Sequence, residues 1–358
     1  MKPSPSSSPT KASPPAKAPT TQQELEDSIA QYIVDEKPLQ VQGTVTAKDS
    51  FSAKTDCEVL RKAMKGLGTD EKAIVSVMGH RTFAQRQELI QTYKTLFSKD
   101  LQKELKSESS GNFKNVLMGL CQSPTEFMAD QLRKAMKGAG TDEDCLIEIL
   151  CTLSNAEMKA VSEAYTTMHN RVLEKDLTSE LSGGLRTLLL SLLQANRPEG
   201  SKVDLRLAAK DAGELCAGGD KKTTETKFSS ILVTRSYAQL RATFEEYKKV
   251  AKKDLADTIK AEFSGDVKKA MLAVVECIRD KAEHFARVLY ESMAGAGTRD
   301  EALIRCVVLR SEVDMLQIKQ KFEQKYKQPL GKMIVGDLSG PYKRLVLAMV
   351  GEEQYSKK

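Results

Sequence analysis

A glycine-rich octapeptide occurs three times in this chain and limits the folds that it can adopt. The sequence reads MKGLGTDE at 64–71, MKGAGTDE at 136–143 and MAGAGTRD at 293–300. A second motif, an acidic residue followed by any residue, Ser and Gly, begins at Glu108, Glu180 and Asp337, each time 42 residues after the first glycine of the octapeptide. A fourth copy begins at Glu262. Two motifs that keep one separation three times indicate a repeated structural unit.

Within the first unit, the pattern of apolar residues predicts five short helices and no strand. Apolar positions recur at helical spacing in five successive groups, separated by residues that favour turns. The groups are Cys57, Leu60 and Met64; Ala73, Ile74, Val77 and Met78; Leu89, Ile90, Tyr93 and Phe97; Leu101 and Leu105; and Phe113, Val116, Leu117 and Leu120. We expect Thr69 to cap the second helix, and Thr141 and Thr298 to cap its counterparts.

The spacing of the motifs divides the chain into four such units, so we predict an all-α fold. Successive acidic motifs are 72, 82 and 75 residues apart, and the long step contains a more polar connector. This period is longer than that of the common solenoid repeats, which indicates small helical domains with their own cores. The predicted divisions are a tail at 1–20, a lead-in at 21–47, repeats at 48–119 and 120–191, a connector at 192–203, and repeats at 204–277 and 279–350.

The segment before the first repeat carries two different patterns. Residues 1–20 are rich in Ser, Pro, Lys, Ala and Thr and contain no acidic residue, a composition that predicts disorder because it offers little apolar surface to bury. Within 21–47, Thr21 stands three residues before Glu24, the spacing of a capping box, and apolar residues follow at helical spacing up to Pro38. This stretch predicts a short amphipathic helix, which either packs on the rest of the chain or binds the groove of a protein partner.

Composition excludes several classes of function. The chain of 358 residues is 40% hydrophobic and 29% charged, which is typical of a globular protein, and its net charge of +6 is too small for a nucleic-acid-binding surface. The 7 cysteines form no C-x-x-C pair, so we expect reduced thiols rather than a zinc site. The densest aliphatic run, 185–193, is half the roughly 20 residues needed to span a bilayer, and no secretory signal is evident. Any membrane contact is therefore expected to be peripheral.

The glycine motif and the remote acid together offer oxygen atoms to a hard cation. Gly-x-Gly between two helices lets backbone carbonyls turn outward at a helix C-terminus, where the dipole is negative. Three carbonyls and a bidentate carboxylate supply about five of the six to eight oxygen ligands that calcium takes. A water or a lipid phosphate would complete the shell. Taken alone, the glycine motif is also typical of an ordinary helix break, but helix capping gives no reason for the remote acid.

The chain resembles the annexins over about residues 42–351, and the combination of motifs is specific. The similar segments are GTVT at 43–46, LRKAMKGLGTDE at 60–71 and LQANR at 193–197. The resemblance implies four repeats of five helices in a slightly curved disc, with calcium-binding loops on the convex face. It also implies calcium-dependent, reversible binding to anionic phospholipid.

The resemblance further implies the calcium ligands, residue by residue. They are the backbone carbonyls of the two glycines and the preceding methionine, together with the carboxylate of the remote acid. In repeats 1, 2 and 4 these residues are Met64, Gly66, Gly68 and Glu108; Met136, Gly138, Gly140 and Glu180; and Met293, Gly295, Gly297 and Asp337. Minor sites would use Thr69 with Glu71, and Thr141 with Glu143.

Repeat 3 departs from this pattern. In place of the octapeptide it reads GELCAGGDKKTTE at 213–225, which predicts a loop about three residues longer that carries Lys221 and Lys222. Added positive charge opposes cation binding. Glu262 is in place, so the sequence leaves open whether Gly219 and Glu262 contribute to a calcium site.

A second departure concerns arginine. Arg81, Arg235 and Arg310 stand at the start of the third helix of repeats 1, 3 and 4, where the annexin pattern has Arg, whereas repeat 2 has LSN at 153–155. In the annexin pattern this arginine resembles one half of an internal salt bridge. Its loss therefore puts the local rigidity of repeat 2 in question.

The leading hypothesis is a non-enzymatic, calcium-dependent protein that binds anionic phospholipid membranes. Lys65 and Lys137, with the small apolar residues Leu67, Ala139 and Ala296, would lie against the headgroups. No grouping of His with Ser and Asp, and no other catalytic motif, is evident in the sequence. The alternative is a helical scaffold that recruits a protein partner through its N-terminal segment, with calcium in a structural role.

The expected location is the cytoplasm, with peripheral attachment to membranes when calcium rises. The sequence leaves open export by a route that needs no signal peptide. It also leaves open self-association of the molecules on a membrane.

Overall fold

All regular secondary structure in the described part of the chain is helical. The computed structural model describes residues 42–66 and 68–357, in which α-helices run consecutively from α2 to α21 and a short 3-10 helix, η1, follows. The predicted all-α fold is thus confirmed for these residues. The tail predicted at 1–20 and the helix predicted within 21–47 lie outside the described residues, apart from the segment 42–47.

Each repeat contributes five consecutive helices, as predicted. In repeat 1 they are α2 (Ala53–Ala63), α3 (Glu71–Met78), α4 (Phe83–Phe97), α5 (Leu101–Ser107) and α6 (Gly111–Leu120). In repeat 2 they are α7 (Pro124–Ala135), α8 (Glu143–Leu150), α9 (Asn155–His169), α10 (Leu173–Glu180) and α11 (Gly183–Leu193). In repeat 3 they are α12 (Leu205–Cys216), α13 (Lys221–Thr234), α14 (Tyr237–Ala251), α15 (Leu255–Glu262) and α16 (Gly265–Arg279). In repeat 4 they are α17 (Lys281–Met293), α18 (Asp300–Arg310), α19 (Met315–Tyr326), α20 (Leu330–Asp337) and α21 (Gly340–Met349), with η1 (Glu353–Lys357) after them.

The ends of the long third helices show how local sequence sets helix boundaries. α4 and α9 each begin with a capping box, Thr82 with Gln85 and Ser154 with Glu157, which satisfies backbone N–H groups that the first turn leaves unpaired. All four third helices end at a residue in the left-handed conformation, with φ between 51° and 57°; these residues are Ser98, Asn170, Lys252 and Lys327. A left-handed residue ends a helix because it turns the chain away from the helix axis.

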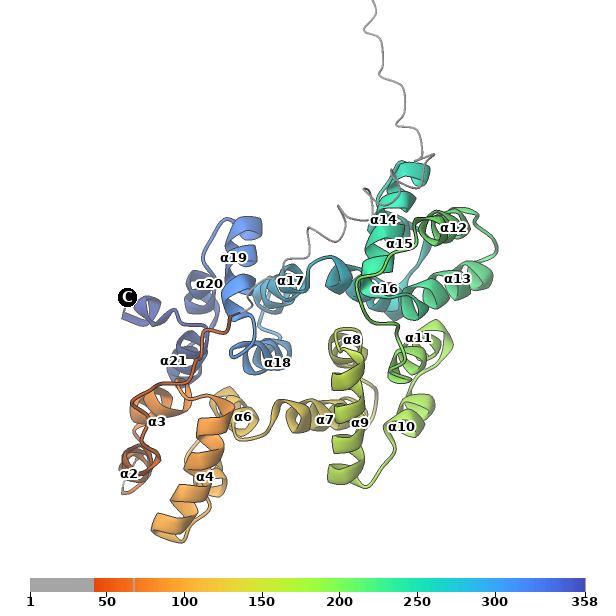
Figure 1. The fold of residues 1–358 in the computed structure, drawn as a ribbon. Helices are drawn as coiled ribbons and strands as arrows, with labels where there is room; N and C mark the ends of the chain where they lie inside the picture. Colours follow the sequence, from red (N-terminus) through yellow and green to blue (C-terminus); the bar gives the residue numbers. More distant parts are fainter. Residues whose placement is uncertain (1–41, 67, 358) are drawn as a thin grey trace, which may run out of the picture.

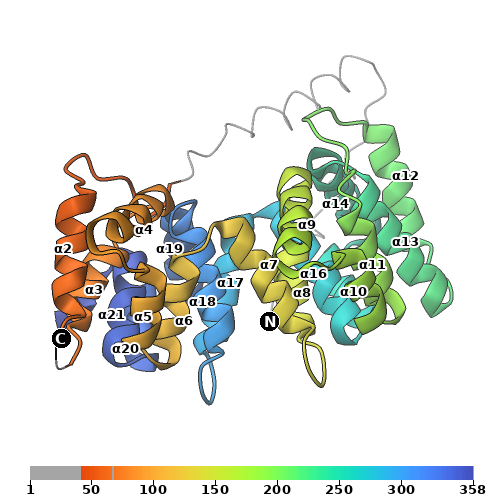
Figure 2. The same cartoon turned by 90° about the horizontal axis from the view of Figure 1, so that it is seen from below.

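The apolar core is divided into two main clusters that pair repeats distant in sequence. One cluster is built mainly from repeats 1 and 4, and the other from repeats 2 and 3. In Figure 1 the helices of repeat 1 (orange) accordingly lie beside those of repeat 4 (dark blue), where α3 and α6 contact α21. The four repeats form a slightly curved disc, which Figure 2 shows from its edge.

A short segment before repeat 1 ties the first repeat to the last. The N–H groups of Thr44 and Val45 both donate to the carbonyl of Ser311, at 2.8 and 3.0 Å. Gly43 lies so close to repeat 4 that an added Cβ would stand 2.5 Å from the backbone of Glu312. Only glycine fits this approach, so the segment 42–45 closes the ring between the two ends of the repeat array.

The arginines that precede the third helix form internal salt bridges in two repeats. Arg81 Nε lies 2.6 Å from Asp56 Oδ2, and Arg235 Nε lies 2.7 Å from Asp211 Oδ2, in both cases joining the turn before the third helix to the first helix. Arg310 does not open the third helix as predicted but is the last residue of α18, because α19 starts only at Met315. It pairs with Asp314 instead.

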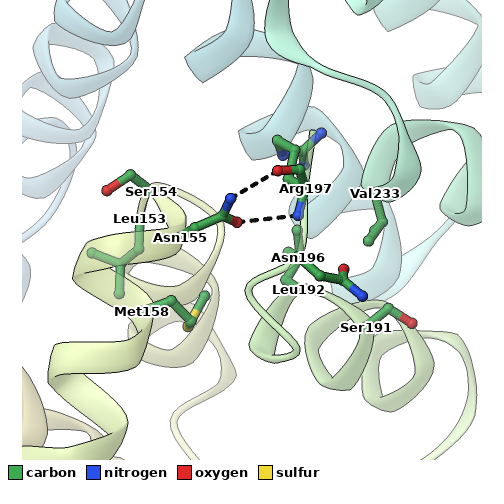
Figure 3. Close-up of a pocket in the computed structure, with 9 residues that line it drawn as sticks. All are labelled: Leu153, Ser154, Asn155, Met158, Ser191, Leu192, Asn196, Arg197 and Val233. Atoms are coloured by element: carbon green, nitrogen blue, oxygen red, sulfur yellow. Dashed lines mark hydrogen bonds between the residues drawn. The ribbon is translucent and has the colours of Figure 1, made fainter. Parts of the chain in front are cut away.

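Repeat 2 replaces both members of this salt bridge with apolar residues. Counted from the acidic motif, Met128 takes the position of Asp56 and Leu153 that of Arg81, and both contribute to the same apolar cluster. Rigidity at this turn has another source, shown in Figure 3: the Asn155 side chain donates to the Arg197 carbonyl at 2.8 Å and accepts from the Arg197 N–H at 3.2 Å. These two bonds hold the connector against the start of α9.

The natural replacement in repeat 2 predicts the outcome of the same exchange in repeat 1. Arg81→Leu alone leaves Asp56, whose side chain is 9% exposed, without its partner. We expect it to lower the free energy of unfolding by about 3 kcal/mol. The double change Asp56→Met with Arg81→Leu reproduces the apolar pair and should recover most of that loss, as measured by chemical denaturation. A double variant as unstable as the single one would contradict this account.

Candidate functional site

The glycine-rich loops of repeats 1, 2 and 4 share one backbone conformation at their glycines. These loops join the first and second helices and span 64–70, 136–142 and 294–299. The first glycines have φ angles of 115°, 115° and 109° and the second glycines 87°, 93° and 89°, in the order Gly66, Gly138, Gly295 and Gly68, Gly140, Gly297. Residues with a Cβ rarely adopt these angles, so glycine is required at both positions.

The prediction that the loop threonines cap the second helix is wrong. Asp70 and Asp142 cap α3 and α8, and their carboxylates accept from the N–H groups of Ala73 and Cys145 at 3.0 Å. In repeat 4 the corresponding residue is Arg299, which makes no side-chain cap. The preference of helix N-caps for Asp, three residues before a helical N–H, is the sequence signal that would have identified the correct caps.

The threonine hydroxyls instead join each loop to its remote acid. Thr69 donates to Glu108 at 2.7 Å, Thr141 to Glu180 at 3.2 Å and Thr298 to Asp337 at 2.5 Å. Each of these acids stands at the C-terminal end of the fourth helix of its repeat. The structure therefore brings together the loop and the acid that are 42 residues apart in sequence.

The donor set of each loop is suited to a hard cation. The side chains of Met64, Met136 and Met293, which stand at the start of each loop or directly before it, are buried and so anchor the loop. Within the described residues, no hydrogen bond is donated to the carbonyls of these methionines or of the six loop glycines. No group of three or more His, Cys, Asp or Glu that could hold a metal occurs there either. Free carbonyls with one carboxylate are a set that suits Ca²⁺ rather than a transition metal.

The residues predicted for minor sites have other surroundings. Thr69 and Thr141 donate to the main acids, as described above. Glu71 lies 3.9 Å from Arg344 of α21, across the boundary with repeat 4. Glu143 is the first residue of α8 and is half-buried.

Repeat 3 contradicts the prediction of a longer loop. Only residues 217–220 separate α12 from α13, because the segment that contains Lys221 and Lys222 forms the first turn of α13. Gly219 lies in this short turn with a φ of 149°. Glu262 ends α15 and is exposed, and the turn after it has the same form as in the other repeats, with Gly265 at φ 63°.

In repeat 4 the remote acid lies near a buried phenol. Burial, followed by the charges of Asp300 and Asp337, raises the pKa of Tyr342 far above its ordinary value. Tyr342 therefore remains a neutral hydroxyl at physiological pH and adds no negative charge at this corner.

The model of one protein family matches four segments of the chain. The family is described as Annexin, and the matched residues are 55–120, 127–192, 210–274 and 284–349. The chain belongs to the annexin family. The resemblance seen in the sequence is thereby confirmed, and so is the fold of four annexin repeats.

Several individual annexins are similar in sequence or structure to most of this chain. Mouse annexin A13 is 48% identical over 302 residues, which cover 84% of this chain and 95% of the relative. Human annexin A7 is 47% identical over 313 residues, or 87% of this chain, but the chain spans only 64% of that longer relative. The solved structure of annexin III, 41% identical, gives a TM-score of 0.83 over 87% of this chain and 98% of its own.

Annexins bind Ca²⁺ and are known for calcium-dependent binding to phospholipid. Among the solved structures similar to this annexin is calcium-bound annexin (Sm)1, which is 36% identical with a TM-score of 0.77 and matches 87% of this chain and 93% of its own. In the part of this annexin that the structure describes, no helix combines the length and apolar character needed to cross a bilayer.

Proposed function

We propose that this annexin binds anionic phospholipid membranes reversibly, through calcium ions that bridge its loops and the lipid phosphates. One observation carries the proposal: a single loop conformation, joined by a threonine to one remote acid, recurs in repeats 1, 2 and 4. Figure 2 shows these three loops projecting from the same convex edge of the molecule. A flat membrane could therefore contact all three at once.

In each loop we assign the cation to the carbonyls of the methionine and the two glycines, with the carboxylate of the remote acid. The threonine holds that carboxylate beside the loop before any ion arrives, so little side-chain freedom is lost on binding. When bound, Ca²⁺ would supply positive charge and coordination positions for phosphate oxygens. The protein offers about five of the six to eight oxygen ligands that calcium takes, which leaves room for the lipid.

Other residues of the loops would lie against the headgroups. Lys65 and Lys137 are exposed beside the glycines and would attract anionic lipid. Ala139 and Ala296 are exposed at the tips, while Leu67 lies outside the described residues. Because three loops act together, binding to a membrane should be far tighter than binding at one loop.

Co-sedimentation with vesicles tests the proposal. The full chain should pellet with phosphatidylserine vesicles in calcium and stay in solution when a chelator is added. Vesicles of phosphatidylcholine alone should retain much less protein, because they carry no net charge for the lysines to attract. Equal pelleting with calcium and with chelator would rule out the bridging mechanism.

The proposal assigns this annexin to the cytoplasm, attached peripherally to membranes when calcium rises. The alternative of a scaffold that recruits a partner through the N-terminal segment concerns residues outside the described part. The same experiment separates the two, because a scaffold with purely structural calcium would not pellet with vesicles. Self-association on the membrane stays a prediction from the sequence.

A further inference from the structure

The turn between α12 and α13 differs from its counterparts in length. It contains residues 217–220, whereas the corresponding loops span 64–70, 136–142 and 294–299. The difference lies in the second helix, because α13 has 14 residues while α3 and α8 have 8 and α18 has 11. In Figure 2, α12 and α13 accordingly meet without a projecting loop.

Asp220 is the residue that starts α13 early. Its carboxylate accepts from the N–H groups of Lys222 and Thr223, both at 3.1 Å, and from the Thr223 hydroxyl. Thr223 stands 39 residues before Glu262, the same distance that separates each loop threonine from its acid in the other repeats. The hydroxyl that should hold the remote acid is therefore used by the helix cap, and Glu262 has no hydrogen-bond partner within the described residues.

A lysine donates a hydrogen bond to one backbone carbonyl of this turn. Lys227 Nζ donates to the Gly218 carbonyl at 3.1 Å, in contrast to the methionine and glycine carbonyls named above in the other repeats, to which no described group donates. Counted from the acidic motif, the residues at the position of Lys227 in repeats 1, 2 and 4 are Ala73, Cys145 and Ala302, which carry no cationic group. Counted in the same way, Gly218 takes the position of Met64, whose carbonyl is a proposed calcium ligand, so repeat 3 has a positive charge of its own at that carbonyl.

We infer that Lys227 is a built-in cation that closes repeat 3 to calcium, so that this annexin takes up calcium at the loops of repeats 1, 2 and 4 only. The ammonium group satisfies the Gly218 carbonyl, and its charge repels a divalent cation together with the exposed Lys221 and Lys222 on the same helix. Glu262 is left outside any ligand set. The inference rests on the proposed function, because it assigns calcium to the other three loops.

The number of calcium ions bound per chain tests the inference. Isothermal titration of the full chain with calcium, in the presence of phosphatidylserine vesicles, should give the same number for the wild type and for Glu262→Gln. Glu180→Gln should lower the number by one. An unchanged number for Glu180→Gln would count against the proposed function, whereas a loss of one ion in Glu262→Gln would overturn the inference about repeat 3.

Removing the lysine provides the reciprocal test. Counted from the acidic motif, Asp220 and Lys222 stand where the other repeats have the two loop glycines, so this test starts from the double variant Asp220→Gly with Lys222→Gly. That double variant should bind no additional calcium ion while Lys227 remains. Adding Lys227→Met, which keeps the length of the side chain but not its charge, should add one ion per chain, and Glu262→Gln should remove it again. Lys210→Met, at an exposed lysine of α12, is the matched control in place of Lys227→Met and should add no ion. If the variant with both glycines and Lys227→Met bound no additional ion, or if the variant with the two glycines alone already bound one, the lysine would not be what closes the site.

Discussion

Binding of calcium-loaded protein to phosphatidylserine vesicles should be abolished when Glu108, Glu180 and Asp337 are changed together to Gln, Gln and Asn. The substitutions remove one negative charge and one bidentate ligand from each loop. Each new amide keeps an oxygen that can accept from the threonine hydroxyl, so the loop should stay joined to the fourth helix. The expected loss is therefore one of calcium affinity and not of fold.

The expected loss of membrane affinity is large because three loops bind the membrane together. Simultaneous engagement of several weak sites raises affinity by about 10² to 10⁴ over one site, and the triple variant loses this gain in addition to the ligands themselves. Single variants should each show an intermediate shift of the calcium concentration at half-maximal pelleting. Retention of calcium-dependent pelleting by the triple variant would show that these acids are not ligands.

A charge-matched control separates this effect from a general loss of negative charge. Glu58, Glu174 and Glu323 are exposed acids of α2, α10 and α19, and none of them belongs to a predicted site. Their joint change to Gln alters the net charge by the same amount. This control should pellet like the wild type at every calcium concentration, and both triple variants should unfold within about 1 kcal/mol of the wild type.

Breaking the ion pair between Glu148 and Arg305 should strongly destabilise the disc. Arg305 of α18 donates to Glu148 of α8 at 2.7 Å, and the two side chains are 3% and 11% exposed. Burial opposes the charge on Arg305, but the carboxylate of Glu148 outweighs it and raises the pKa of Arg305. The pair joins the cluster of repeats 1 and 4 to the cluster of repeats 2 and 3.

Glu148→Leu should lower the free energy of unfolding by about 3 to 5 kcal/mol, because it leaves a buried guanidinium without its counter-charge. Two other nitrogens of Arg305, Nε and Nη1, already have no hydrogen-bond partner, so the guanidinium has little else to stabilise it. Chemical denaturation would measure the loss.

The double variant Glu148→Leu with Arg305→Met tests the cause. It removes both charges and keeps the volume, and should recover stability to within about 1 kcal/mol of the wild type. If the double variant were as unstable as Glu148→Leu alone, packing and not the buried charge would explain the loss. Vesicle binding by the double variant should stay close to that of the wild type, because neither residue belongs to a loop.

The sequence alone determined the features that depend on neighbouring residues. The five helices of each repeat follow from apolar spacing and from the Gly, Ser and Asp residues between them, which act over one or two helical turns. The need for glycine in the loops can also be inferred from the sequence, because no other residue adopts these backbone angles without strain. The equal spacing of loop and acid pointed to their meeting, and the Thr69–Glu108 hydrogen bond shows that contact.

Only the tertiary structure decided between local alternatives of similar energy. Thr69 and Asp70 are both good helix caps, and the choice of Asp70 depends on the remote acid that binds the threonine. Around Lys221, by contrast, local contacts that the sequence pattern did not identify select a helix over a loop: the cap by Asp220 and the bond from Lys227 to Gly218. The pairing of repeat 1 with repeat 4, and the ion pair between Glu148 and Arg305, join residues too distant in sequence for any local pattern to specify, since such contacts form only when whole apolar faces pack.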